Sequence, residues 1–187
     1  MVQTPAKPLT LEAFLTRPET KPASEFVDGK VFQKPMPQGK HSALQADLMA
    51  LINAAVRAPK IARAFPELRC TFGGSSIVPD IAVFVWARIQ RDANGEIANT
   101  FPLTPDWTLE ILSPGQSPTK VTKKIMRCLK HGSQMGWLIA PEDKAVWACR
   151  PQREIEIFDE PEDLLPTPDF ADALTVTVAD LFALLLL

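Results

Sequence analysis

Paired cysteines, an excess of positive charge and long apolar runs are all missing from this sequence. Its three cysteines, Cys70, Cys128 and Cys149, are widely spaced and form no Cys-x-x-Cys pair, which argues against a disulfide framework and a structural zinc site. The formal net charge is -2, so no global positive field draws the chain toward nucleic acid or anionic lipid. Any binding of phosphate must therefore be local, and we interpret the cysteines as reduced, small apolar residues.

Membrane and export signals are also lacking. No apolar run approaches the roughly 20 residues that a membrane span needs, and Met1 to Pro8 contain no segment that resembles a signal peptide. The apolar ending Leu181 to Leu187 continues a helix-like pattern that begins at Asp180, which favours a packed terminal helix or a dimer contact over an anchor. We therefore expect a cytoplasmic protein with no membrane partner.

Several common catalytic motifs are absent as well. The chain has no Gly-x-Ser-x-Gly elbow and no His-Glu-x-x-His pair, and neither Gly29-Lys30 nor Gly39-Lys40 is followed by Ser or Thr in a phosphate-binding loop. These absences exclude the familiar serine hydrolases, zinc proteases and P-loop enzymes. We also expect no organic small-molecule cofactor.

What is present favours one mixed α/β domain over residues 1–187. The length and the 46% hydrophobic content suffice for one sizeable core. Periodicity predicts helices over 11–15, from His41 to before Pro59, over 117–131 and from Asp180 onward. It predicts a hairpin over 25–33 turning at Asp28-Gly29, and strands at 69–72, 78–85, 107–112, from 137, at 146–149 and at 154–158. The strands 69–72 and 78–85 are expected to pair, with Gly73 to Ser76 as their turn.

Two acidic residues stand in or next to apolar strands. Glu110 lies inside the run Trp107 to Leu112, where a buried carboxylate without a partner would be costly. Asp80 follows Pro79 at the head of another apolar run. Taken singly, Glu110 could be an edge-strand residue facing water and Asp80 a turn residue. Taken together, two carboxylates can hold Mg²⁺ or Mn²⁺, which prefers oxygen ligands and keeps several waters.

A basic helix follows Glu110 and supplies candidates for a third group. Its apolar face consists of Val121, Ile125, Cys128 and Leu129. Lys124 falls at the margin of that face, so its long side chain can run along the core and present its ammonium beside the carboxylates. There it would orient a water and stabilise negative charge on a phosphate. Lys120, Lys123 and Arg127 either form a solvated basic face or bind backbone phosphates.

Five segments, in this order, resemble the Uma-type endonuclease family, a branch of the PD-(D/E)xK superfamily. They are Leu9 to Leu15, Glu25 to Lys30 followed by Pro35 and His41, Val78 to Val83, Thr108 to Pro114, and Met135 to Ile139. The resemblance covers most of the chain. It implies a restriction-endonuclease-like fold, with a mixed central sheet flanked by helices, and a DNA-cleaving site that uses Mg²⁺ or Mn²⁺.

The resemblance also assigns residues. The wider superfamily has a lysine two positions after the glutamate, where this chain has Leu112; in the Uma-type group a helix lysine replaces it, and that lysine matches Lys124. Glu25 and His41 match further family positions and are candidate accessory groups. Glu25 could equally be a hairpin residue paired with a base, and His41 a residue of the helix N-terminus. Cys128 and Ala140 depart from the family, which has an aromatic residue and an aspartate there.

We therefore hypothesise a metal-dependent endonuclease that acts on DNA, with Asp80, Glu110 and Lys124 as catalytic residues and the two acids as metal ligands. A homodimer is expected, because two strands require two sites. The alternative is a nucleic-acid-binding or protein-interaction module that keeps the nuclease fold and does little chemistry, which the acidic charge balance favours. A dimeric scaffold that uses the apolar C-terminus is a third reading.

Overall fold

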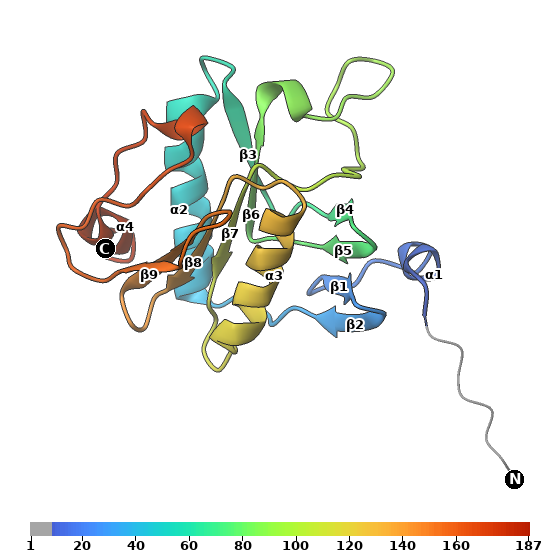
Figure 1. Cartoon of the computed structure of the whole chain (residues 1–187), viewed down its shortest axis with the longest axis horizontal. Helices are drawn as coiled ribbons and strands as arrows, with labels where there is room; N and C mark the ends of the chain where they lie inside the picture. The colour runs from blue at the N-terminus through green and yellow to red at the C-terminus, as the bar shows by residue number, and fades with distance from the viewer. Residues whose placement is uncertain (1–8) are drawn as a thin grey trace, which may run out of the picture.

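The computed structural model describes residues 9–187, so the expectation about Met1 to Pro8 lies outside the described residues (Figure 1). The helices are α1 (Leu11–Leu15), α2 (Gly39–Val56), α3 (Pro118–Lys130) and α4 (Val178–Ala183), with 3-10 turns η1 (Trp86–Arg88) and η2 (Asp169–Ala171). The strands are β1 (Ser24–Val27), β2 (Lys30–Gln33), β3 (Ala62–Pro66), β4 (Cys70–Phe72), β5 (Ser75–Ile77), β6 (Ile81–Val85), β7 (Trp107–Ile111), β8 (Met135–Ala140), β9 (Ala145–Cys149) and β10 (Glu156–Phe158).

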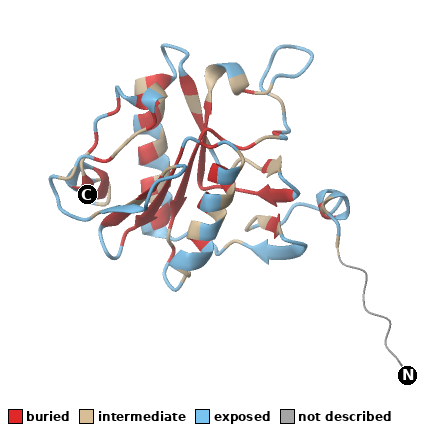
Figure 2. Ribbon diagram, viewed as in Figure 1, coloured by how far each residue is buried: buried red, intermediate tan, exposed pale blue. Residues whose placement is uncertain are grey.

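A six-stranded mixed sheet in the order β10-β9-β8-β7-β6-β3 forms the centre of the molecule. Only β7 and β8 pair in parallel within it, and α3 provides the crossover between them. Helix α2 covers one face of this large sheet and α3 covers the other, so that the central strands β6, β7 and β8 are buried (Figures 1 and 2). The mixed sheet flanked by helices that the sequence predicts is thus confirmed.

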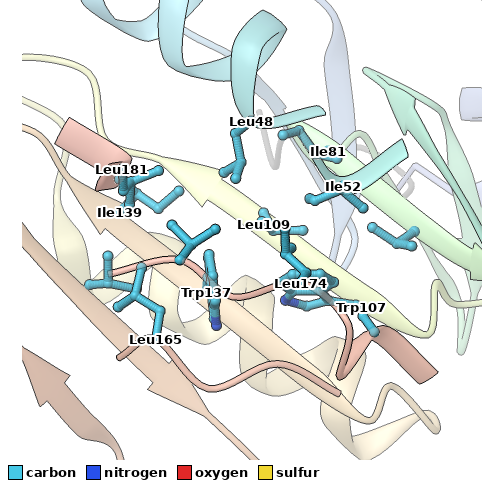
Figure 3. Close-up of a cluster of buried hydrophobic side chains, with 14 of the residues drawn as sticks. Leu48, Ile52, Ile81, Trp107, Leu109, Trp137, Ile139, Leu165, Leu174 and Leu181 are labelled. Atoms are coloured by element: carbon cyan, nitrogen blue, oxygen red, sulfur yellow. The ribbon is translucent and has the colours of Figure 1, made fainter. Parts of the chain in front are cut away.

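The face toward α2 carries the main apolar core. Alternate residues of β7 point to it, with Trp107, Leu109 and Ile111 packing against α2, as expected for side chains that alternate across a strand. The Trp107 and Trp137 rings meet edge to face with 4.9 Å between their centroids. Figure 3 shows this cluster, to which the C-terminal segment contributes Leu165, Leu174 and Leu181.

A small four-stranded sheet, in the order β2-β1-β5-β4, stands beside the large one. Its β1–β2 hairpin turns at Asp28 and Gly29, whose φ angles of 50° and 75° are those the Asp-Gly dipeptide accepts. The predicted hairpin is confirmed, and so are the helices that became α1, α2 and α3. Thr10 caps α1 by accepting a hydrogen bond from the amide of Ala13.

Two strand predictions need correction. The run Val78 to Val85 is not one strand: Val78, Pro79 and Asp80 lie between β5 and β6, and β6 starts only at Ile81. Strand β4 pairs with β5, across a turn of Gly73 and Gly74, so Ser75 and Ser76 belong to a strand. Because Pro79 lacks an N–H, a continuous ladder is not favoured there, and the chain passes from the small sheet to the large one.

Strand β3, which pairs with β6 along its whole length, has no counterpart among the sequence predictions. The C-terminal prediction is confirmed in part: α4 begins with a capping box between Thr177 and Asp180 and buries Leu181 and Phe182, but it ends at Ala183, and Leu186 and Leu187 are exposed. The three cysteines are free, as expected, and all three are buried. Within residues 9–187, no helix combines the length and the apolar character that crossing a bilayer requires.

Candidate active site

Asp80 and Glu110 come together where β6 and β7 pair. Ile81 is opposite Leu109 in this antiparallel ladder, and continuing the register by one residue sets Asp80 opposite Glu110. Directly opposed residues project from the same face of a sheet, here the α3 face. Both side chains line one cleft, and each residue is only 2% exposed. The fold therefore brings together two acids that are 30 positions apart in the sequence.

Asp80 is held by donors from three directions. Its Oδ2 accepts a hydrogen bond from the Ile111 amide at 2.7 Å and lies 3.1 Å from His41 Nε2. Its Oδ1 accepts one from Lys34 Nζ at 2.6 Å. Burial alone would raise the pKa of the Asp80 carboxyl, but the His41 hydrogen bond and the Lys34 charge outweigh burial and hold this pKa well below its usual range. Asp80 is therefore ionised.

Lys124 links the other two acids of the site. Its ammonium lies 2.8 Å from Glu110 Oε2 and 2.8 Å from Glu25 Oε1, with its side chain 11% exposed. Glu25 Oε1 also accepts the Val78 amide at 2.8 Å, which ties β1 to the segment before Asp80. The sequence argument for Lys124 rested on its place at the margin of the apolar helix face. The structure brings its ammonium to Glu110.

Glu110 is the least satisfied acid of the group. Its Oε1 atom is buried and has no hydrogen-bond partner among the described residues. Burial raises the pKa of the Glu110 carboxyl to about 8, although the nearby Lys124 charge acts in the opposite direction. Burial by itself would lower the pKa of Lys124, but Glu110 and Glu25 keep it above its ordinary value. An unpaired buried carboxylate oxygen leaves one coordination position open beside Asp80.

Lys34 is a member of the cleft that sequence reasoning missed. It follows β2, its side chain is 10% exposed, and its ammonium contacts both Asp80 Oδ1 and, at 3.0 Å, the Val78 carbonyl oxygen. In the sequence it is one lysine of many beside two prolines. The only local signal was its position just beyond the hairpin that carries Glu25.

His41 lies at the start of α2 and is 6% exposed. The helix-terminus reading is right about its location, and its Nε2 contact adds a role in holding Asp80. Its Nδ1 is buried and has no partner among the described residues. For Glu25 the structural reading describes its surroundings, because it is a hairpin residue paired with a base, and that base is Lys124.

The cleft has a volume of about 860 Å³ and gathers positive charge in a chain whose net charge is negative. Its lining contains more basic residues than acidic ones. The basic residues are Lys30, Lys34, Lys120, Lys123, Lys124, Arg127 and Lys130. Lys120, Lys123 and Lys130 are exposed on the outer side of α3. Arg127 differs from them because its guanidinium holds both oxygens of Asp28, at 2.6 and 2.7 Å, and Ser75 Oγ at 3.2 Å.

The donor atoms fit a hard cation that keeps part of its water shell. No group of three or more histidines, cysteines and acids in residues 9–187 is arranged as a metal cage. What the cleft offers is two carboxylates, one with an orphaned oxygen, which is the sparse oxygen set that Mg²⁺ accepts and Zn²⁺ does not favour. The cysteines are unsuited as ligands, since burial raises the pKa of the Cys128 thiol to about 12.

Comparison with known proteins fits this arrangement. A family model described as Uma2, putative restriction endonuclease, matches residues 11–179. The chain belongs to the Uma2 family. The resemblance inferred from the five segments is thereby confirmed.

Comparison with solved structures gives, among its matches, a near one and a distant one. A crystal structure described as a putative nuclease belonging to DUF820, from Anabaena variabilis ATCC 29413, is 61% identical, covers 96% of this chain and 100% of its own, and superposes with a TM-score of 0.94. The electron-microscopy structure of a DrdV–DNA complex matches with a TM-score of only 0.40 at 13% identity, over 76% of this chain and 11% of that one, and is too distant to bear on function. A search of curated proteins found no match. The fold is thus that of a putative nuclease.

Proposed function

We propose that this Uma2 protein is a Mg²⁺- or Mn²⁺-dependent endonuclease that hydrolyses DNA phosphodiester bonds. One observation carries the proposal: Asp80, Glu110 and Lys124, distant in sequence, meet in a single cleft in which a buried Glu110 oxygen has no partner within residues 9–187. Leaving a buried acceptor unpaired costs free energy. Such a cost is understandable at a position that a cation is meant to fill.

The metal ligands in this proposal are Asp80 and Glu110. A bound Mg²⁺ or Mn²⁺ ion would polarise the scissile phosphate and lower the pKa of a coordinated water. The arrangement of the acids supports this role, because the ionised Asp80 and Glu110 line one cleft, and Glu110 Oε1 has no partner among the described residues.

Lys124 is the proposed catalytic cation. Its ammonium remains protonated between Glu110 and Glu25, and it can donate to the attacking water or to a phosphate oxygen. Glu25 serves as a positioning residue for Lys124 because its Oε1 lies 2.8 Å from the ammonium. His41 acts similarly on Asp80 by contacting Oδ2.

DNA is the proposed substrate because the cleft concentrates positive charge next to these acids. Lys120 and Lys123 are exposed on α3, where they can neutralise phosphates on either side of the scissile bond. Arg127 takes part less directly, since its guanidinium is engaged by Asp28. We further propose a homodimer, which would present one site to each strand of a duplex.

The decisive experiment is a plasmid-nicking assay with Mn²⁺ on Asp80→Asn, Glu110→Gln and Lys124→Met. Each should lose roughly 100-fold or more of the wild-type rate, since each removes a group proposed to act on the reacting phosphate. Lys123→Met is the matched control, because Lys123 is adjacent on the same helix and exposed. It should retain activity within a few fold.

Amide and methionine substitutions are used so that loss of activity is not loss of fold. Asn and Gln preserve acceptors for the Ile111 amide and for Lys124. If wild-type protein neither nicks plasmid nor binds Mn²⁺ by calorimetry, the enzyme proposal fails and the protein is a binding module with a nuclease fold. If activity persists in one of the three variants, that residue is removed from the mechanism.

A further inference from the structure

Two lysines of the cleft, Lys34 and Lys124, contact its buried acids and have different partners. Lys124 sits between Glu110 and Glu25, whereas Lys34 contacts Asp80 and no other acid within hydrogen-bond distance. Glu67 Oε1 is next nearest to Lys34, at 3.7 Å, and the Glu67 side chain is half exposed. Each acid proposed to bind metal therefore has a lysine of its own in the metal-free protein.

The two oxygens of Asp80 are engaged differently. Oδ2 receives two fixed donors, the Ile111 amide of β7 and the His41 ring of α2. Within the part of the chain that the structure describes, Oδ1 receives only Lys34, whose four-carbon side chain can swing without any movement of the backbone. Oδ1 is therefore the Asp80 atom that can exchange its partner, and at present that partner is an ammonium.

A cation shared by Asp80 Oδ1 and Glu110 Oε1 would have to displace a bound donor at the first oxygen but not at the second. Glu110 Oε1 has no partner to lose among the described residues, but Asp80 Oδ1 would have to give up its 2.6 Å contact with Lys34. An ammonium left at that distance would also lie next to the incoming ion and repel it. Metal binding and the Lys34–Asp80 pair thus exclude each other at one oxygen atom.

We propose that Lys34 is an internal counter-ion that occupies the Asp80 side of the metal site and sets its affinity for the divalent cation. This inference rests on the proposed metal-dependent function and deepens it. In the metal-free protein Lys34 neutralises the buried Asp80; when the ion binds, the ammonium leaves Oδ1 and turns into the cleft, of which it is a lining residue. Lys34 is a positioning residue in this scheme.

Removing the counter-ion has two opposite consequences. Without Lys34 the metal-free protein keeps an ionised, 2%-exposed Asp80 with one donor fewer, so its thermal midpoint should fall. The same change frees Oδ1, so Mn²⁺ should bind tighter by roughly tenfold, within the range usual for coupled sites. A residue that only supported the local structure would weaken metal binding when replaced.

The test is a calorimetric titration of Mn²⁺ into wild-type, Lys34→Gln, Lys34→Met and Lys34→Arg proteins, with the Mn²⁺-induced shift in thermal midpoint as a second readout. Both neutral variants should bind tighter and show a larger shift than wild type. Lys34→Arg retains a cation and should stay near wild type. Lys30→Gln is the control, because Lys30 is exposed, lines the same cleft and has no contact with Asp80 among the described residues.

The outcomes separate this inference from the proposed function. Wild-type binding with unchanged or weaker affinity in both neutral variants overturns the counter-ion role and leaves the metal site standing. Binding by the neutral variants alone supports the inference in its strongest form. Absence of binding in every protein overturns both. If Lys34→Met is not folded by circular dichroism, Lys34→Gln, which can still donate to the Val78 carbonyl, decides.

Discussion

The two faces of strand β7 serve different purposes, although their residues alternate along one five-residue strand. Trp107, Leu109 and Ile111 point into the apolar core beneath α2, whereas Thr108 and Glu110 point toward α3. The first face contains large, fully buried apolar side chains (Figure 3). The second includes the buried Glu110 carboxyl group, and Thr108 Oγ1 and Glu110 Oε1 are buried without a partner among the described residues, as is Trp107 Nε1 on the first face.

Because side chains alternate along a strand, one strand can present residues that stabilise the fold on one face and residues of the candidate site on the other. Burial of apolar area on the α2 face supplies favourable free energy, and part of it offsets the cost of burying charged groups on the other face. Substitutions on the α2 face should therefore change the free energy of unfolding, and substitutions on the α3 face should change activity.

The largest effect is expected on the α2 face. Trp137→Ala removes a fully buried ring that packs against Trp107 and donates to the Pro166 carbonyl, so the free energy of unfolding should fall by about 3–5 kcal/mol. Urea titration measures this. Trp147→Ala, at a partly buried position on β9, should cost clearly less. Equal losses at the two tryptophans would break the comparison.

On the α3 face, Glu110→Gln should lower activity strongly and change stability little. We expect kcat/KM for plasmid cleavage to fall roughly 100-fold, equivalent to about 2.7 kcal/mol, while the urea midpoint of the metal-free protein moves little. The amide has the same shape and avoids burying a charge, and it can still accept from Lys124. A large drop in stability would mean that Glu110 supports the fold, as the residues on the α2 face do.

Gly136 affects both the stability of the fold and the position of the candidate site. A Cβ built at this position of β8 would lie 2.2 Å from Ile125 Cγ2 of α3, so the helix packs against the sheet over a residue without a side chain. Gly136→Ala should cost about 1–3 kcal/mol and also lower activity, since displacing α3 draws Lys124 away from Glu110. In the double variant with Ile125→Ala the combined loss should be smaller than the sum of the two single losses, because the side chain that meets the new Cβ is gone. Strictly additive losses in this double-mutant cycle would contradict the contact.

The smallest effect is expected on the outer side of α3. Lys123→Gln, tested in the Glu110→Gln background so that DNA is not cut, should weaken DNA binding by a few fold and reduce the slope of log affinity against log salt by about 1. Arg57→Gln, exposed at the end of α2 on the opposite face of the sheet, should leave the slope unchanged. A loss of the same size at both positions would indicate a nonspecific charge effect.

The sequence was most informative where a structural signal is local. The turn at Asp28-Gly29 and the apolar spacing of α2 and α3 depend on neighbours a few residues apart, and these elements match the predictions. Strand β3 escaped because Ala62–Pro66 is short and ends in proline, so its pairing with β6 decides its structure. Pro79 is visible in the sequence, but the apolar run that contains it predicts one continuous strand.

The candidate site was predictable in part for the same reason. Asp80 and Glu110 are conspicuous because acids are rare in apolar runs, and the helical position of Lys124 follows from its period. Lys34 gave no such signal, because its importance arises only when the end of the hairpin meets a residue 46 positions away. Likewise, the sequence could not show that Arg127 is held by Asp28, across 99 positions.

Two of the acids in the cleft also complete the backbone hydrogen bonding of the fold. Asp80 Oδ2 accepts the Ile111 amide and Glu25 Oε1 accepts the Val78 amide, so each would leave an unpaired N–H if lost. Glu110 accepts from no backbone group among the described residues. A descendant of this protein that abandoned catalysis would therefore be expected to keep Asp80 and Glu25 for folding and to change Glu110 first, which makes that position the most informative marker of activity among relatives.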